Sequence, residues 1–337
     1  MSGFSFWVPF NGDFKLLDKL KEHFSDTING NKIEGIYFPA PQEFFGSARV
    51  VKTFTMDDAK KVIGFCNDLG WKSNMLMNSS CGGADWYSPK TISKTLFLIK
   101  NMKTLGLTSI TITNPIYLQK IKKEIPDINI TVSVISEIAS VQRAKYFEDL
   151  GADAFVPDRD INRNLELLKE IKTSTKMNMI LMVNEGCLYR CPQRNIHYNF
   201  TSHCSTPNEK EYYTMDFHSN YCIDIKKNNP EELLKSQFIL PQHLNKYKSI
   251  TKSFKIVGRT RYTEDILNIT KAYLGEGGAG NILNLMSGTT PIVCERYGYN
   301  ISAKLLDDNF FKKVTTCNKN CMNCNYCKKL IDKGLTS

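Results

Sequence analysis

The 337-residue sequence lacks the motifs of several common enzyme classes. It has no His-Glu-x-x-His zinc motif, no Gly-x-Ser-x-Gly nucleophile turn and no phosphate-binding P-loop. A hydrolase needs an activated nucleophile or a metal-bound water, and no sequence motif indicates either one. The turn at Asn11–Phe14, which follows the first expected strand, also lacks the glycines of a dinucleotide-binding fingerprint.

Long apolar runs are missing as well, and we expect no leader. No stretch of about 18 apolar residues is present, so we expect no membrane-spanning helix. The first residues, Met1–Trp7, have neither the basic residues nor the cleavage site of a secretory signal. We therefore expect a cytoplasmic protein. In that compartment the eleven cysteines stay reduced and favour metal or cluster binding over disulfides.

The charge is not balanced. The chain carries 44 lysines and arginines against 34 acidic residues, a formal net charge of +10 at pH 7. Such a charge favours RNA or another anionic partner through electrostatic attraction alone. A solvated, lysine-rich surface explains the lysines about as well, because they are spread along the whole chain.

Short apolar segments alternate with amphipathic segments through most of the chain. This alternation predicts an α/β protein, a (β/α)8 barrel of the TIM type over residues 1–285, with an open doubly wound sheet as the alternative. A long insertion, 186–253, follows the seventh strand, and 286–337 form a small Cys-rich C-terminal appendage. The expected strands are Phe4–Pro9, Gly35–Pro39, Ser73–Met77, Ser109–Thr113, Ile128–Val134, Ala154–Pro157, Met179–Val183 and Phe254–Val257.

Eight of the eleven cysteines fall into two sets, and the first set lies in the insertion. Cys187, Cys191, Cys204 and Cys222 have the spacing C-x3-C-x12-C-x17-C. Four thiolates suit either a tetrahedral zinc or a [4Fe–4S] cluster with one thiolate on each iron. The spacing leaves both open, but the position beyond a barrel strand, where active sites collect, favours the cluster.

The second set lies near the C-terminus. Cys317, Cys321, Cys324 and Cys327 form C-x3-C-x2-C-x2-C within eleven residues. The run contains the tight C-x2-C-x2-C spacing of ferredoxin-type clusters. It predicts a second metal centre, either a [4Fe–4S] cluster or zinc.

The order of several short motifs resembles a known family from about residue 30 to residue 275. The chain is similar to the collagenase-like peptidases, family thirty-two among peptidases of unknown mechanism. The order and spacing of the motifs fit better than any single motif does. The matching pieces are Phe45–Arg49, Phe54–Asp58, Met77-Asn78, Leu150–Asp153, Asp158–Asp160, Gly186-Cys187 and Lys255–Arg259.

The resemblance implies an iron–sulfur protein. Better-understood members of the family support oxygen-independent hydroxylation of ubiquinone precursors, or of a pyrimidine in tRNA or ribosomal RNA, and use four cysteines to hold a [4Fe–4S] cluster. Cys187, Cys191, Cys204 and Cys222 lie in the matching region. This chain departs from the family where Glu185 replaces the histidine before Gly186, and where Val257 replaces an acid.

These observations lead to a functional hypothesis. We expect an iron–sulfur-dependent hydroxylase that acts on RNA or on a small aromatic or quinone precursor. Arg49, Arg159 and Arg259 would anchor an anionic substrate, and Glu185 would donate a proton. The alternatives are a peptidase, as the family name states, a peptide-modifying enzyme, or a non-catalytic iron–sulfur subunit beside a paralogous partner or electron donor.

Overall fold

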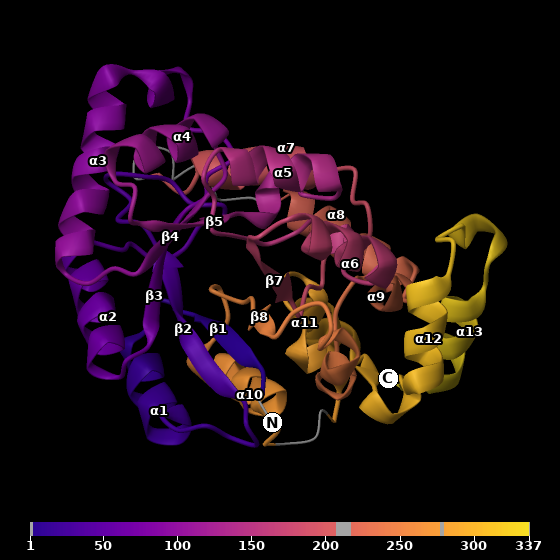
Figure 1. Ribbon diagram of the computed structural model, residues 1–337. Helices are drawn as coiled ribbons and strands as arrows, with labels where there is room; N and C mark the ends of the chain where they lie inside the picture. The colour runs from indigo at the N-terminus through magenta and orange to yellow at the C-terminus, as the bar shows by residue number, and fades with distance from the viewer. Residues whose placement is uncertain (1–2, 207–216, 277–279, 337) are drawn as a thin grey trace.

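The computed structural model describes residues 3–206, 217–276 and 280–336. In this part of the chain eight parallel strands pair in sequence order and close into a barrel (Figure 1). Pairing of Ser5 with Ser253 joins the last strand to the first. The predicted (β/α)8 barrel is therefore confirmed. The strands are β1 (Ser5–Pro9), β2 (Lys32–Pro39), β3 (Lys72–Met77), β4 (Ser109–Ile112), β5 (Asn129–Val132), β6 (Ala154–Phe155), β7 (Asn178–Met182) and β8 (Ser253–Lys255).

Helices cover the outside of the barrel, and side-chain caps begin most of them. The Thr55 side chain and the Asp58 carboxylate form a reciprocal capping box at the start of the second helix. Asn114 caps the fourth helix, whose first residue is Pro115. These helices are α1 (Phe14–Phe24), α2 (Met56–Asp68), α3 (Pro89–Thr104), α4 (Pro115–Glu124), α5 (Val141–Asp149), α6 (Leu165–Ser174) and α10 (Thr263–Leu274).

The segment between β7 and β8 contains α7 (Arg194–His203), α8 (Phe217–Asn228) and α9 (Glu232–Lys235). Helix α7 packs on loops at the carboxyl ends of the strands. The Thr201 hydroxyl donates to the Ala48 carbonyl at 3.1 Å, and the Ser80 amide donates to the Ser202 hydroxyl at 2.9 Å. The insertion therefore lies against the barrel face where active sites form.

The C-terminal region lies beside α9 (Figure 1). It comprises α11 (Thr290–Tyr297), β9 (Asn300–Ile301), α12 (Asp308–Thr316), α13 (Tyr326–Gly334) and β10 (Leu335–Thr336), and β10 pairs antiparallel with β9. Phe310 of α12 is buried and stacks on Phe238, which follows α9, with ring centroids 6.5 Å apart. This contact holds the appendage against the insertion.

Short 3-10 turns complete the chain path: η1 (Ala84–Tyr87), η2 (Val134–Ser136), η3 (Arg159–Ile161), η5 (Pro241–Tyr247), η6 (Ile282–Leu285), η7 (Ala303–Leu305) and η8 (Cys321–Asn323). Among the described residues no helix is both long and apolar enough to cross a membrane.

Aromatic rings fill the interior where β8 meets β1. Phe254 is fully buried, and its ring centroid lies 5.7 Å from that of Phe6 and 5.4 Å from that of Phe4. Strand β8 has only three residues, so this aromatic packing helps its backbone pairing to hold the strand in the barrel.

We expect Phe254→Ala to lower the free energy of unfolding by about 3–5 kcal/mol, because it leaves a cavity at the closure of the barrel. Urea denaturation followed by circular dichroism measures the change. Phe97→Ala is the control, since Phe97 is 59% exposed on α3 and its loss should change stability by less than about 0.5 kcal/mol. Equal effects of the two substitutions would contradict the packing described.

Candidate active site

A cavity of about 120 Å³ opens at the carboxyl ends of the strands. The structure places all four residues expected in the active site in its lining: Arg49 after β2, Arg159 after β6, Glu185 after β7 and Arg259 after β8. The sequence separates them widely, and the barrel brings them together because parallel strands deliver their following loops to one face. Tyr37, Asn78, Tyr198 and Lys255 also line the cavity.

A buried ion pair connects two of these residues. Arg159 Nη1 lies 3.0 Å from Glu185 Oε2, and the two side chains are 3% and 7% exposed. Burial disfavours the ionised carboxyl, but the charges of Arg159 and Arg49 outweigh it and lower the pKa of Glu185 to about 2. Glu185 is therefore a charge partner at neutral pH, and this environment does not favour the expected role as proton donor.

The Arg159 guanidinium also contacts two other side chains. Arg159 Nη1 donates to Cys187 Sγ at 3.1 Å, and Nη2 donates to the Tyr198 hydroxyl. The Tyr198 ring lies under the Arg49 guanidinium, 4.9 Å from its central carbon. Arg159 thus joins the end of β6, the loop after β7 and helix α7 at one point.

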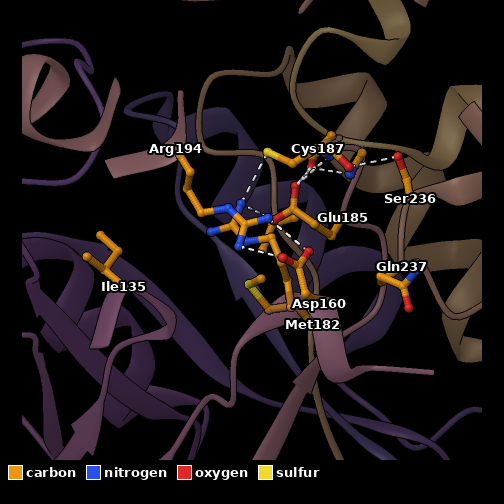
Figure 2. A network of polar contacts seen from close by, with 12 residues as sticks. Ile135, Asp160, Met182, Glu185, Cys187, Arg194, Ser236 and Gln237 are labelled. Carbon is orange, nitrogen blue, oxygen red and sulfur yellow. Dashed lines mark hydrogen bonds and ion pairs between the residues drawn. The ribbon is translucent and has the colours of Figure 1, made fainter. Parts of the chain in front are cut away.

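A second ion pair fixes the loop that carries Cys187 (Figure 2). Arg194 Nη1 lies 2.8 Å from Asp160 Oδ2 and 3.4 Å from Asp158 Oδ1. Burial opposes the charge of Arg194, but the hydrogen bond and the charge of Asp160 raise its pKa above the ordinary value. The Arg190 amide also donates to Asp160 at 3.2 Å. The loop after β6 therefore holds the loop after β7 in position.

Lys255 is a site residue that the sequence analysis missed. Its Nζ lies 3.9 Å from the centroid of the Tyr37 ring, and its side chain lines the cavity. Desolvation, together with the charge of Arg259, lowers the pKa of Lys255 to about 7. The available signal was a lysine inside the apolar strand Phe254–Val257, which counts against a simple core strand.

Arg259 completes the positive charge of the cavity. Its side chain is buried, and Nη1 donates to the Ser47 hydroxyl at 2.9 Å. Burial lowers the pKa of Arg259 to about 10, so the guanidinium stays charged at neutral pH. Among the described residues that line this cavity, three guanidiniums and one lysine face a single carboxylate. The cavity is therefore suited to bind an anion.

The four cysteines of the first set lie in the loop after β7, at the end of α7 and in α8. Cys187 lies beside Arg159, and Cys222 accepts a hydrogen bond from the Thr289 hydroxyl at 3.0 Å. Cys204 is buried at the end of α7, and Cys191 lies in the loop before that helix. Within residues 3–206, 217–276 and 280–336, no three His, Cys, Asp or Glu side chains are placed to hold a metal ion. A [4Fe–4S] cluster on these four thiols stays a prediction.

The second set lies elsewhere. The four cysteines expected to form a second metal centre, Cys317, Cys321, Cys324 and Cys327, line a separate cavity of about 220 Å³ beside α12 and α13. These thiols share a cavity because they are close in sequence, between the end of α12 and the first turn of α13.

Comparisons with known proteins agree with the fold. The model of a family described as peptidase family U32 matches residues 21–275. A protein of Methanocaldococcus jannaschii, described as an uncharacterized protease, is 31% identical over 294 residues, which cover 87% of this chain and 86% of that protein. The solved structure of the U32 peptidase Mk0906 superposes with a TM-score of 0.56 at 18% identity, and covers 76% of this chain and 93% of that one.

The Arg159–Glu185 pair is expected to dominate the stability of the site. Glu185→Ala should lower the free energy of unfolding by about 3–5 kcal/mol, because it leaves a buried guanidinium without its carboxylate. The double substitution Arg159→Met/Glu185→Leu should recover most of that loss, since no unpaired charge remains. Chemical denaturation measures all three proteins.

The matched control is an exposed pair. Lys246 Nζ lies 2.9 Å from Asp308 Oδ2, with side chains 42% and 73% exposed, so Asp308→Asn should leave stability nearly unchanged. Wild-type stability in Glu185→Ala would show that this pair is not buried as described.

Proposed function

The chain belongs to peptidase family U32, and on that premise we propose that it is a peptidase that binds the terminal carboxylate of a short peptide in the barrel mouth. The observation that carries the proposal is that the Lys255 side chain lines one cavity with three guanidinium groups, where burial and the charge of Arg259 lower its pKa to about 7. Both the family description and the description of the relative from Methanocaldococcus jannaschii name proteases. The cavity itself supports the proposal through its side chains, which offer groups for substrate binding and for proton transfer.

The arginines supply the binding step. A guanidinium matches a carboxylate through two parallel N–H donors, which fixes the orientation of the bound group. Among the described residues Arg259 has no carboxylate partner, whereas Arg159 is occupied by Glu185. Arg259, with Arg49 nearby, is therefore the group that we assign to the substrate carboxylate or to the carbonyl oxygen of the scissile amide.

Lys255 supplies the proton transfers. Above its pKa the neutral amine accepts a proton from water while the water oxygen attacks the amide carbon. A guanidinium stabilises the oxyanion that forms. The carbon–nitrogen bond then breaks, and the protonated Lys255 returns its proton to the leaving amine. The products are a carboxylic acid and an amine, and the lysine is regenerated.

The thiols favour a second candidate function, an iron–sulfur-dependent hydroxylase acting on RNA or on a small aromatic or quinone precursor. Cys187 contacts Arg159, which lines the cavity, with Arg159 Nη1 3.1 Å from its sulfur. Cys187, Cys191, Cys204 and Cys222 would hold the [4Fe–4S] cluster, which supplies a Lewis acid or an electron path when bound. The net charge of +10 suits an RNA substrate or another anion. A hydroxylase of this kind would also act with a paralogous partner subunit or an electron donor.

The peptidase proposal predicts a specific dependence on pH. Hydrolysis of short peptides should rise with pH through about 7, because the amine of Lys255 loses its proton there and becomes the base. Lys255→Met should lower kcat by about 10²–10⁴-fold and abolish that rise. Lys248→Met, at an exposed lysine, is the matched control and should behave as wild type. Release of free amine from di- and tripeptides is the measurement.

Two further comparisons separate the candidates. Peptides with an amidated C-terminus should be poor substrates, since the arginines lose the carboxylate that they bind. Cys187→Ser prepared without iron should retain peptide hydrolysis if the peptidase proposal is correct. Hydrolysis that is absent in the wild type, or that is unchanged in Lys255→Met, rejects the proposed role of the lysine.

A further inference from the structure

We propose that the cavity lined by Cys317, Cys321, Cys324 and Cys327, here called the tail pocket, binds a [4Fe–4S] cluster. The site lies outside residues 21–275, the part of the chain matched by the family model, so it is a feature of this chain's own C-terminal region. The proposal does not depend on the function assigned to the barrel mouth.

The four thiols come from successive points along the tail, between the end of α12 and the start of α13. Cys317 directly follows α12, Cys321 begins η8, Cys324 follows η8, and Cys327 lies in the first turn of α13. Lys319 adopts a left-handed conformation with φ of 59°, which is uncommon for a residue other than glycine. Its Nζ donates to the Val314 carbonyl at 2.5 Å, across the end of α12. This contact folds the loop back over the helix, so that all four thiols border one space.

The spread of the four thiols around that space favours a cluster over a single ion, because among the described residues no three His, Cys, Asp or Glu side chains are placed to hold one metal ion. The tail pocket has a volume of about 220 Å³. Zinc draws its four sulfur ligands to about 2.3 Å, which brings them close together. A [4Fe–4S] cluster takes one thiolate on each iron and adds inorganic sulfides, so it fills a wider cavity. The tight C-x2-C-x2-C run between Cys321 and Cys327 is also the spacing that ferredoxin-type clusters use.

The charges around the tail pocket suit an anionic cluster. Four lysines line it, and Glu231 is the acidic residue among the described lining residues. A cluster held by four thiolates carries net negative charge, and nearby cations stabilise it and raise its reduction potential. The lining lysines are Lys235, Lys313, Lys319 and Lys328.

Two neighbouring residues link the tail pocket to the loop that carries Cys187. Lys235, at the end of α9, lines the pocket, and the hydroxyl of the next residue, Ser236, donates to the Cys187 carbonyl at 2.8 Å (Figure 2). Arg163 packs over both Phe238 and Phe310, which join the insertion to α12. A cluster in this position would lie next to Lys235, one residue away from the contact with Cys187.

The first experiment measures iron in the full chain purified without oxygen. Iron and acid-labile sulfide are quantified, and the reduced protein is examined by electron paramagnetic resonance. Cys321→Ser/Cys324→Ser should lose about four irons per chain relative to the wild type. Both residues are exposed, and circular dichroism reports whether the barrel stays folded. Cys81→Ser, at a partly exposed cysteine outside both sets, should keep the wild-type iron content.

Two results overturn the proposal. One is an iron content that does not change in Cys321→Ser/Cys324→Ser. The other is stoichiometric zinc in the wild type that disappears in this variant. Because the comparison counts iron lost from the tail alone, a cluster on the first set of cysteines does not affect the outcome, and neither does loss of peptidase activity.

A second experiment locates the cluster without removing a ligand. Lys313 lines the tail pocket, whereas its neighbour Lys312 does not, and both are exposed on α12. Lys313→Met should shift the midpoint potential of the reduced signal to a more negative value, since a cation that stabilises the reduced cluster is lost. Lys312→Met should leave it close to wild type. Equal potentials in the two variants contradict the location.

Discussion

The arrangement of the barrel mouth depends on the buried pair between Arg159 and Glu185. This pair ties the end of β6 to the end of β7, and the same guanidinium contacts Cys187 and Tyr198. It also occupies the one carboxylate among the described lining residues of the cavity. Among the described residues that line the cavity, Lys255 and Arg259 have no carboxylate partner, so the cavity is suited to an anion.

The environment of the cavity also affects the chemistry of the Lys255 amine. Burial, together with the charge of Arg259, lowers the pKa of Lys255 to about 7, so a fraction of this amine is neutral and able to accept a proton near neutral pH. Peptide hydrolysis uses both properties, the anion site for binding and the amine for proton transfer. Membership of peptidase family U32 agrees with that chemistry. The thiols beside the mouth and in the tail are the groups that would hold the proposed iron–sulfur clusters.

Much of the fold was predictable, because the alternation of apolar strands with capped helices follows local rules. The meeting of Arg49, Arg159 and Arg259 also followed from the barrel, since each comes soon after a strand. Lys255 was missed because strand patterns are read from apolar residues, and a single lysine there does not show that its amine faces the cavity. The path of α7 across the mouth was not predictable either, since it depends on contacts such as Thr201 with Ala48 between distant segments. The tail cysteines, in contrast, lie within eleven residues, so their spacing alone was informative.

The most direct test of this account is the pKa of the Lys255 amine. Nitrogen NMR of lysine side chains across a pH titration measures it, with Lys255→Met to assign the signal. The account predicts one lysine that titrates near pH 7 and is missing from the variant, because burial and Arg259 disfavour its charge. If every lysine titrates near its ordinary value of 10.5, the cavity does not perturb the amine, and Lys255 is not the base.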